Sequence, residues 1–229
     1  MAAAMPAIAS SFPRHRLTRP RRTLAWLGGW LLCAAVAQTG VERHGESGNE
    51  TVLAWRRMLE EARPLAVDDK LQAVNQFFNR RLRFTSDQEA WGMPDYWATP
   101  LEFMRQSQGD CEDFAIAKYV SLRMLGLPAE QLRLVYVRAR FGSAASGNSE
   151  AHMVLGYYAD LAGDPLILDS LVNGIRPAAS RPDLSPVFSF NAQGLWMPGS
   201  AKPAATDPTA RLSRWRDMLD RMRAEGLQL

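Results

Sequence analysis

The residues of this chain that could do covalent chemistry centre on Cys111, which stands between Asp110 and Glu112. The apolar residues that follow recur at three- and four-residue steps as far as Leu125, which predicts a helix that begins at this cysteine. Backbone N–H groups and the helix dipole at such a position favour a thiolate over a thiol. The segment therefore predicts either a nucleophilic cysteine or a buried structural one, and other residues must decide between them.

A cysteine nucleophile needs a base, and usually a third group that orients the base. Of the three histidines, two lie near the N-terminus, and only His152 lies in an expected ordered element, a strand over residues 152–158. A second predicted strand, residues 165–169, ends in Asp169, and a hairpin of the two would bring Asp169 beside His152 on one face. Either residue alone could simply end a strand. Together with Cys111 they predict a Cys-His-Asp triad.

The N-terminus has the pattern of a targeting segment. Residues 1–23 contain five arginines and no acidic residue, residues 24–37 are apolar, and the three residues at 35–37 have the A-x-A form of a cleavage site. We therefore expect a signal peptide at residues 1–37, since the apolar run is shorter than a membrane-spanning helix requires. An uncleaved anchor is the alternative. Residues 38–50 are expected to form a flexible leader, and residues 51–229 a single domain with a C-terminal helix.

Cleavage at this site would change both the charge and the cysteine count. Five of the 27 basic side chains lie in residues 1–37, which leaves 22 basic against 24 acidic side chains and a net charge of −2. This balance gives no case for nucleic-acid binding. Cys33 is removed with the signal peptide, so Cys111 is the one cysteine of the mature chain and no intramolecular disulfide can form.

Apolar periodicity predicts the elements that must position these residues. Helical spacing is found in residues 52–59, 68–82 and 100–108, and again after Asp207. Alternating apolar residues predict further strands at residues 132–137, 186–190 and 194–197. Residues 141–150 are rich in Gly, Ser and Ala and predict a mobile loop. We expect an α+β fold in which the nucleophile helix packs on an antiparallel β-sheet.

The order of a helix-borne cysteine, then a histidine and an aspartate on adjacent strands, is similar to that of papain/transglutaminase-like enzymes. More closely, the chain resembles the LapG-type periplasmic cysteine proteinases, the bacterial transglutaminase-like cysteine proteinase family. The resembling stretches are residues 70–79, 95–102, 109–119, 151–155, 166–169 and 183–191. Two features depart from the family pattern: Ser170 stands where Asn is expected, and the loop at residues 141–150 is longer than usual.

The resemblance implies an exported, calcium-dependent cysteine endopeptidase of the periplasm, with Cys111 as nucleophile, His152 as base and Asp169 as orienting group. It implies that the substrate is the N-terminal region of a large cell-surface adhesin, cut to release the adhesin and disperse a biofilm. The implied partner is an inner-membrane cyclic di-GMP receptor that sequesters the protease. No integral membrane segment is expected after signal cleavage. The alternatives are a transglutaminase- or amidase-type acyl transferase with the same triad, and a non-catalytic binding module on this fold.

The acids around the cysteine pose an electrostatic problem. Negative charge beside Cys111 raises the pKa of the thiol and opposes the effect of the helix dipole. A bound Ca²⁺ would reverse the sign of the local field. The resemblance assigns this ion to Asp110 and Glu112, whereas Asp113 stands where a capping box would place its acid.

Overall fold

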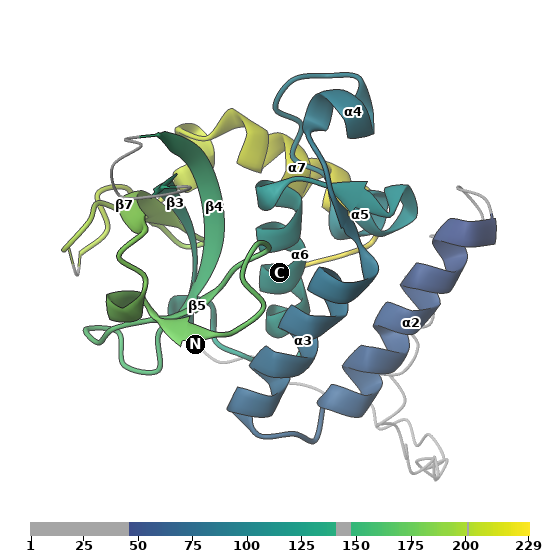
Figure 1. Ribbon diagram of the computed structural model, residues 1–229, viewed down its shortest axis with the longest axis horizontal. Coiled ribbons are helices and arrows are strands. Elements are labelled where there is room, and N and C mark those ends of the chain that lie inside the picture. Colours follow the sequence, from purple (N-terminus) through teal and green to yellow (C-terminus); the bar gives the residue numbers. More distant parts are fainter. Residues whose placement is uncertain (1–45, 141–147, 201) are drawn as a thin grey trace, which may run out of the picture.

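The computed structural model describes residues 46–140, 148–200 and 202–229 (Figure 1). The predicted signal peptide at residues 1–37, most of the predicted leader and residues 141–147 of the predicted loop lie outside the described residues. Within the described part of the chain, no helix is long and apolar enough to cross a membrane.

The described residues form six α-helices. They are α2 (Glu46–Ala62), α3 (Val67–Arg81), α4 (Asp87–Trp91), α5 (Pro100–Gln106), α6 (Cys111–Met124) and α7 (Ser213–Ala224). Helix α6 packs on the sheet, and α3 and α5 pack on α6. Helix α2 begins at Glu46, so the last five residues of the predicted flexible leader are helical. A short 3-10 helix, η3 (Pro208–Ala210), separates Asp207 from α7, which therefore begins later than the sequence indicated.

The main sheet has six strands in the order β6-β5-β4-β3-β7-β8, and every neighbouring pair is antiparallel. Its strands are β3 (Leu132–Arg140), β4 (Ser149–Tyr157), β5 (Leu166–Leu168), β6 (Arg176–Pro177), β7 (Leu184–Phe190) and β8 (Leu195–Trp196). Two short parallel strands, β1 (Arg83–Phe84) and β2 (Gln108–Gly109), pair apart from this sheet and bring Phe84 beside the start of α6.

Helix α6 lies at the centre of the molecule, between the sheet and helices α3 and α5 (Figure 1). Because it is enclosed on both sides, it is apolar nearly all round rather than along one stripe. Ile116, Tyr119 and Leu122 are completely buried, and even Lys118 on this helix is inaccessible to solvent. The expected α+β fold, with a nucleophile helix packed on an antiparallel sheet, is confirmed.

The predicted hairpin exists, but its register differs from the prediction by two residues. Leu155 pairs with Leu168 and Tyr157 with Leu166, so Asp169 follows the last residue of β5 and falls level with Val154. Successive side chains alternate between the faces of a sheet, so a two-residue shift keeps the aspartate on the face of His152. The two side chains meet as diagonal rather than direct neighbours.

Candidate active site

Cys111 is the first residue of α6, and Asp110 caps the helix. The Asp110 carboxylate accepts a hydrogen bond from the backbone N–H of Glu112 at 3.2 Å. The expectation that Asp113 completes a capping box is wrong, because its Oδ1 accepts the N–H of Ala98 at 2.8 Å and its side chain is buried. Asp113 thus ties the first turn of α6 to the segment that leads into α5.

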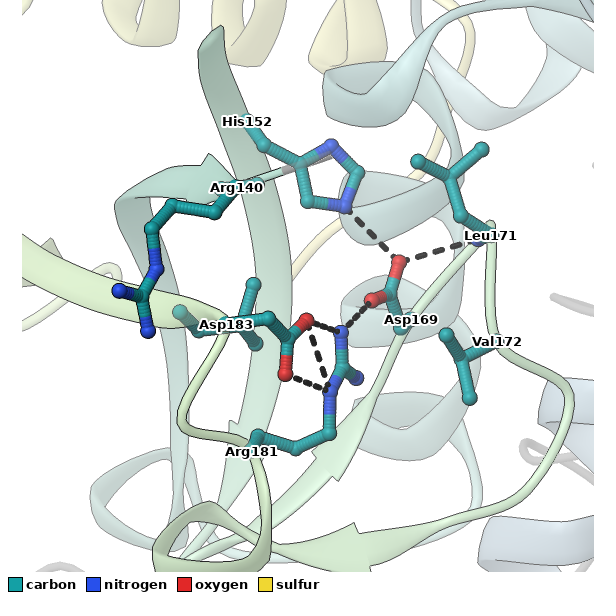
Figure 2. A pocket seen from close by; sticks show the side chains of 9 residues that line it. Arg140, His152, Asp169, Leu171, Val172, Arg181 and Asp183 are labelled. Carbon is teal, nitrogen blue, oxygen red and sulfur yellow. Dashed lines mark hydrogen bonds and ion pairs between the residues drawn. The ribbon is translucent and has the colours of Figure 1, made fainter. Parts of the chain in front are cut away.

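His152 and Asp169 form a buried hydrogen-bonded pair. His152 Nε2 lies 2.8 Å from Asp169 Oδ1, and the two side chains are 3% and 1% exposed (Figure 2). The backbone N–H of Leu171 donates to the same oxygen at 3.0 Å. Because Asp169 is ionised, it is the acceptor, and the imidazole carries its proton on Nε2. Nδ1, which points away from Asp169 in Figure 2, is then left free to exchange a proton.

Arg181 holds the other side of the Asp169 carboxylate. Its Nη2 donates to Asp169 Oδ2 at 2.8 Å, and its Nε and Nη2 also bind Asp183 (Figure 2). Burial by itself would raise the pKa of Asp169, but the hydrogen bonds from His152, Leu171 and Arg181 outweigh it and lower that pKa to about 2.

The main chain of Asp169 is fixed as well as its side chain. The ammonium of the buried Lys118 donates to its carbonyl oxygen at 3.0 Å, and the amide of Asn79 donates to the same atom at 2.8 Å. Burial lowers the pKa of Lys118 to about 7, and the charge of Asp169 opposes that shift. Helices α3 and α6 thus fix the main chain of the residue whose carboxylate Arg181 binds.

A cleft of about 420 Å³ joins the cysteine to the histidine. Cys111, His152 and Ala151 line it together with Asp110 and Glu150, and Phe84, Ser86 and Leu171 complete its wall. The Cys111 side chain is 8% exposed. The backbone N–H of Met153, which follows His152, lies close enough to the sulfur to lower the pKa of the thiol. The structure therefore brings all three predicted triad residues to one site.

The thiol of Cys111 is nevertheless held in its protonated form in this arrangement. Burial raises the pKa of Cys111, and the negative charges of Glu112 and Asp110 raise it further. The thiol donates a hydrogen bond to Glu112 Oε2 at 2.8 Å. Positive charge near Glu112 and Asp110 would oppose this shift and favour the thiolate.

An acidic cluster next to the cysteine could receive such a charge. Three carboxylate oxygens lie within 4.8 Å of one another, one each from Asp87, Asp110 and Asp113. A second group of three atoms lies within the same distance, one each from Asp110, Cys111 and Glu112. The pKa of Asp87 is raised to about 7, mainly by burial and next by the negative charge of Asp110. Burial is the largest cause that raises the pKa of Asp110 to about 8, and the hydrogen bond and charge of Glu112 raise it further. Among the described residues, no hydrogen-bond donor reaches the buried oxygens Asp87 Oδ1 and Asp113 Oδ2. Closely spaced, poorly solvated carboxylate oxygens are the donor set that a hard divalent cation prefers, so the cluster fits calcium.

Sequence reasoning missed two residues of this site, Asp87 and Arg181. Asp87 follows Ser86, whose hydroxyl caps the short helix α4, so its position resembles that of an ordinary first-turn acid. Arg181 lies in the connection before β7, where no local pattern marks it. The departure at Ser170 leaves the hydroxyl of that residue buried without a hydrogen-bond partner among the described residues.

Comparison with known proteins identifies the family. The family model described as bacterial transglutaminase-like cysteine proteinase (BTLCP) matches residues 54–182. Legionella pneumophila LapG is similar in structure, with a TM-score of 0.70 and 35% sequence identity over 83% of this chain and 97% of that one. Its EGTA-treated form has a TM-score of 0.71 at the same identity and coverage. Its calcium-bound form has a TM-score of 0.70 and 35% identity over 83% of this chain and 98% of that one. No curated protein matches the chain. The chain belongs to the bacterial transglutaminase-like cysteine proteinase family and is a cysteine protease.

Proposed function

We propose that Cys111, His152 and Asp169 are the catalytic triad of a cysteine endopeptidase. The observation that carries the proposal is the buried pair of His152 and Asp169, 2.8 Å apart, in the cleft that also contains the sulfur of Cys111. A buried aspartate that is ionised and bound on both oxygens has the properties of an orienting group for a catalytic histidine. The family to which the chain belongs supports the same roles.

The geometry defines the proton path. His152 Nδ1 takes the thiol proton of Cys111, and the sulfur attacks the carbonyl carbon of the scissile peptide. The resulting oxyanion accepts the backbone N–H of Cys111, which has no acceptor inside α6 because it is the first residue of the helix. Nδ1–H then protonates the leaving amine, and an acyl-enzyme remains. A water molecule that gives its proton to His152 hydrolyses the thioester and restores the thiol.

Calcium is the proposed cofactor, with Asp110 and Glu112 among its ligands. Asp87 and Asp113 belong to the same cluster and extend the candidate set. The calcium-bound form of the similar Legionella LapG supports this proposal. When bound, the ion supplies positive charge beside the sulfur, which opposes the effect of the acids on the thiol pKa. Release of Glu112 from Cys111 would leave the thiol free to give its proton to His152.

The wider biological role is proposed from the family resemblance. Residues 1–37 direct export to the periplasm and are cleaved, and the single domain from about residue 51 onward is the protease. Its substrate is the N-terminal region of a large surface adhesin, whose release disperses a biofilm. An inner-membrane cyclic di-GMP receptor sequesters the enzyme. N-terminal sequencing of the exported protein tests the first point, since an intact residue 1 would contradict it.

In the decisive experiment, the purified protein is incubated with an N-terminal adhesin fragment, and the masses of the products are measured by mass spectrometry. Two shorter fragments, in calcium but not in EGTA, are expected for the wild type. Cys111→Ala should produce neither fragment while its circular dichroism and thermal unfolding stay native. Crosslinked or deamidated substrate of full length would indicate an acyl transferase instead. Equal cleavage by Cys111→Ala would rule out the enzyme mechanism.

A further inference from the structure

The segment between α4 and α5 reaches the acidic cluster through its main chain. The N–H of Tyr96 donates to Asp87 Oδ2, and the N–H of Ala98 donates to Asp113 Oδ1 at 2.8 Å. The other oxygen of each acid, Asp87 Oδ1 and Asp113 Oδ2, is buried and accepts no hydrogen bond from the described residues. Each of these N–H groups therefore fixes one oxygen of a cluster acid and leaves the second oxygen available to a cation.

Residues 95–98 have no secondary structure of their own to hold this position. They lie outside the helices and strands of the described chain. The backbone of Asp95 has a φ of +57°, in the left-handed region that residues other than glycine seldom adopt. A conformation of this kind persists where surrounding groups hold it. The position of the two N–H groups thus depends on contacts from elsewhere in the chain.

Two arginines of α7 supply such contacts. Arg214 donates from Nε to the carbonyl oxygen of Asp95 at 2.9 Å, and its Nη2 pairs with Asp95 Oδ2 at 2.8 Å. Arg221 donates from Nη2 to the carbonyl oxygen of Trp97, and its guanidinium carbon lies 4.6 Å from the centre of the Tyr96 ring. The two arginines are seven residues apart, close to two helical turns, so they lie on one face of α7. That face contacts residues 95, 96 and 97 in turn.

Helix α7 can act as a fixed support because its other face is anchored in the core. Trp215, Met218 and Met222 are buried there. Arg221 also pairs with Glu102 of α5, at 3.2 Å between Nε and Oε1, which fastens α7 beside that helix (Figure 1). The contacts of the two arginines with residues 95–97 therefore come from a firmly held element.

Other arginines of α7 show a different pattern. Arg216 pairs with Asp217 and Arg223 pairs with Asp220, and both acids belong to α7 itself. Exposed pairs of this kind add little to stability. Arg221 and Arg223 both stand in the last turn of α7, so they interact alike with the helix dipole. Arg223 is therefore a matched control for Arg221, with the same side chain, charge and helical turn.

We propose that Arg214 and Arg221 are positioning residues for the calcium site. They hold residues 95–98 so that the N–H groups of Tyr96 and Ala98 orient Asp87 and Asp113 for the ion. This inference rests on the calcium cofactor of the proposed function. It extends the site to a helix that the family match, residues 54–182, does not include. Calcium affinity then depends on the C-terminal helix.

Calcium titration of the purified protein by isothermal titration calorimetry tests the proposal. The variants are Arg214→Met and Arg221→Met, which keep an apolar stem and remove the guanidinium, with Arg223→Met as the control. Loss of a group that orients a metal ligand weakens metal binding, so the dissociation constant should rise about tenfold in Arg221→Met. A rise of about threefold is expected in Arg214→Met, whose pair with Asp95 is half exposed. The constant of Arg223→Met should stay within about twofold of the wild-type value.

The sign of the effect separates positioning from charge. Each arginine carries a positive charge that repels calcium, so a purely electrostatic role would make the variants bind calcium more tightly. Weaker binding therefore requires a change in how the carboxylates are held.

Hydrogen exchange in EGTA gives a second measurement that needs no metal. Arg221→Met should speed exchange at the amides of Tyr96 and Ala98 about tenfold relative to Arg223→Met, and should leave the amides of β3 unchanged. A merely structural role would speed exchange at both sets of amides together.

Unchanged or tighter calcium binding by both Arg214→Met and Arg221→Met would overturn the inference and leave the calcium cofactor standing. Equal exchange at Tyr96 and Ala98 in Arg221→Met and its control would also overturn it. Wild-type protein that binds no calcium would overturn the cofactor itself, and the inference with it. Should Arg221→Met fold poorly, Arg214→Met carries the test, because the Arg214 side chain is half exposed.

Discussion

In the absence of calcium, the free energy of unfolding of this protein should be larger at pH 5 than at pH 8. In the metal-free chain, burial and neighbouring negative charge raise the pKa of Asp87 to about 7 and that of Asp110 to about 8. In the unfolded chain both carboxyls titrate near pH 4. Between these limits the two carboxyls bind protons in the folded state that they do not bind in the unfolded state. The buried Lys118, whose pKa is lowered to about 7, opposes the effect above pH 7 but not below it. The free energy of unfolding therefore increases as the pH is lowered through the raised pKa values.

The expected magnitude is large for a single site. Asp87 is 5% exposed, and its pKa is raised from 3.8 to about 7. At about 1.4 kcal/mol per pH unit, ionising this one group in the folded protein costs on the order of 4 kcal/mol. Calcium binds the ionised carboxylates, so it should stabilise the fold more at pH 8 than at pH 5. Calcium at 100 times its dissociation constant would add about 2.7 kcal/mol.

Urea unfolding followed by tryptophan fluorescence measures both effects, in EGTA and in calcium, at unit steps from pH 5 to pH 8. Asp87→Asn should flatten the pH dependence in EGTA, whereas Asp68→Asn, an exposed acid in the first turn of α3, should leave it unchanged. The reasoning fails if metal-free protein is most stable at pH 8. It also fails if calcium stabilises the protein equally at pH 5 and pH 8.

Two further substitutions test the supports of the site. A methyl group on Gly109 would overlap Asp113 Oδ2 and lie 2.9 Å from the Phe103 ring, so Gly109→Ala should lower the free energy of unfolding by about 1–3 kcal/mol. Gly174→Ala, whose methyl group would meet no atom closer than 3.7 Å, is the matched control and should change it by less than about 0.5 kcal/mol in the same urea titration. Arg181→Met removes a buried partner of Asp169 and should cost about 3 kcal/mol of stability and at least tenfold in kcat at unchanged KM. Steady-state kinetics that show a raised KM with normal kcat would contradict the positioning role.

The sequence was informative where chemistry and local pattern coincide. Cys111 could be placed at a helix start because a capping acid precedes it and an apolar helical pattern follows. His152 and Asp169 could be paired because strand alternation preserves the face even when the register is shifted by two residues. The shift arises in the connection between Tyr157 and Leu166, where a turn closed by the Gly163 N–H on Asp160 is followed by two residues that stand outside the pairing of β4 with β5. Local sequence does not fix how many residues such a connection leaves out of the ladder.

The parts of the site that could not be predicted depend on contacts between distant segments. Asp87 reaches Asp110 because the parallel pairing of β1 with β2 brings the segment before α4 beside the start of α6. Arg181 reaches Asp169 because β7 returns along β3 and positions the connection that precedes it. Neither residue differs in its own neighbourhood from a surface acid or a loop arginine. Their roles arise only from burial, and burial is a property of the tertiary fold.

The early end of β5 links substrate binding to catalysis. Were β5 to continue its pairing past Leu168, its next residues would lie beside Met153 and Ala151 on β4. The turn at Asp169 instead directs the Asp169 carboxylate toward His152 and leaves the N–H of Met153 near the sulfur of Cys111. Leu171, just beyond the turn, holds that carboxylate with its N–H and lines the cleft with its side chain. One reversal of the chain therefore supplies the orienting acid and one wall of the cleft, so substitutions in this turn should impair peptide binding and turnover together.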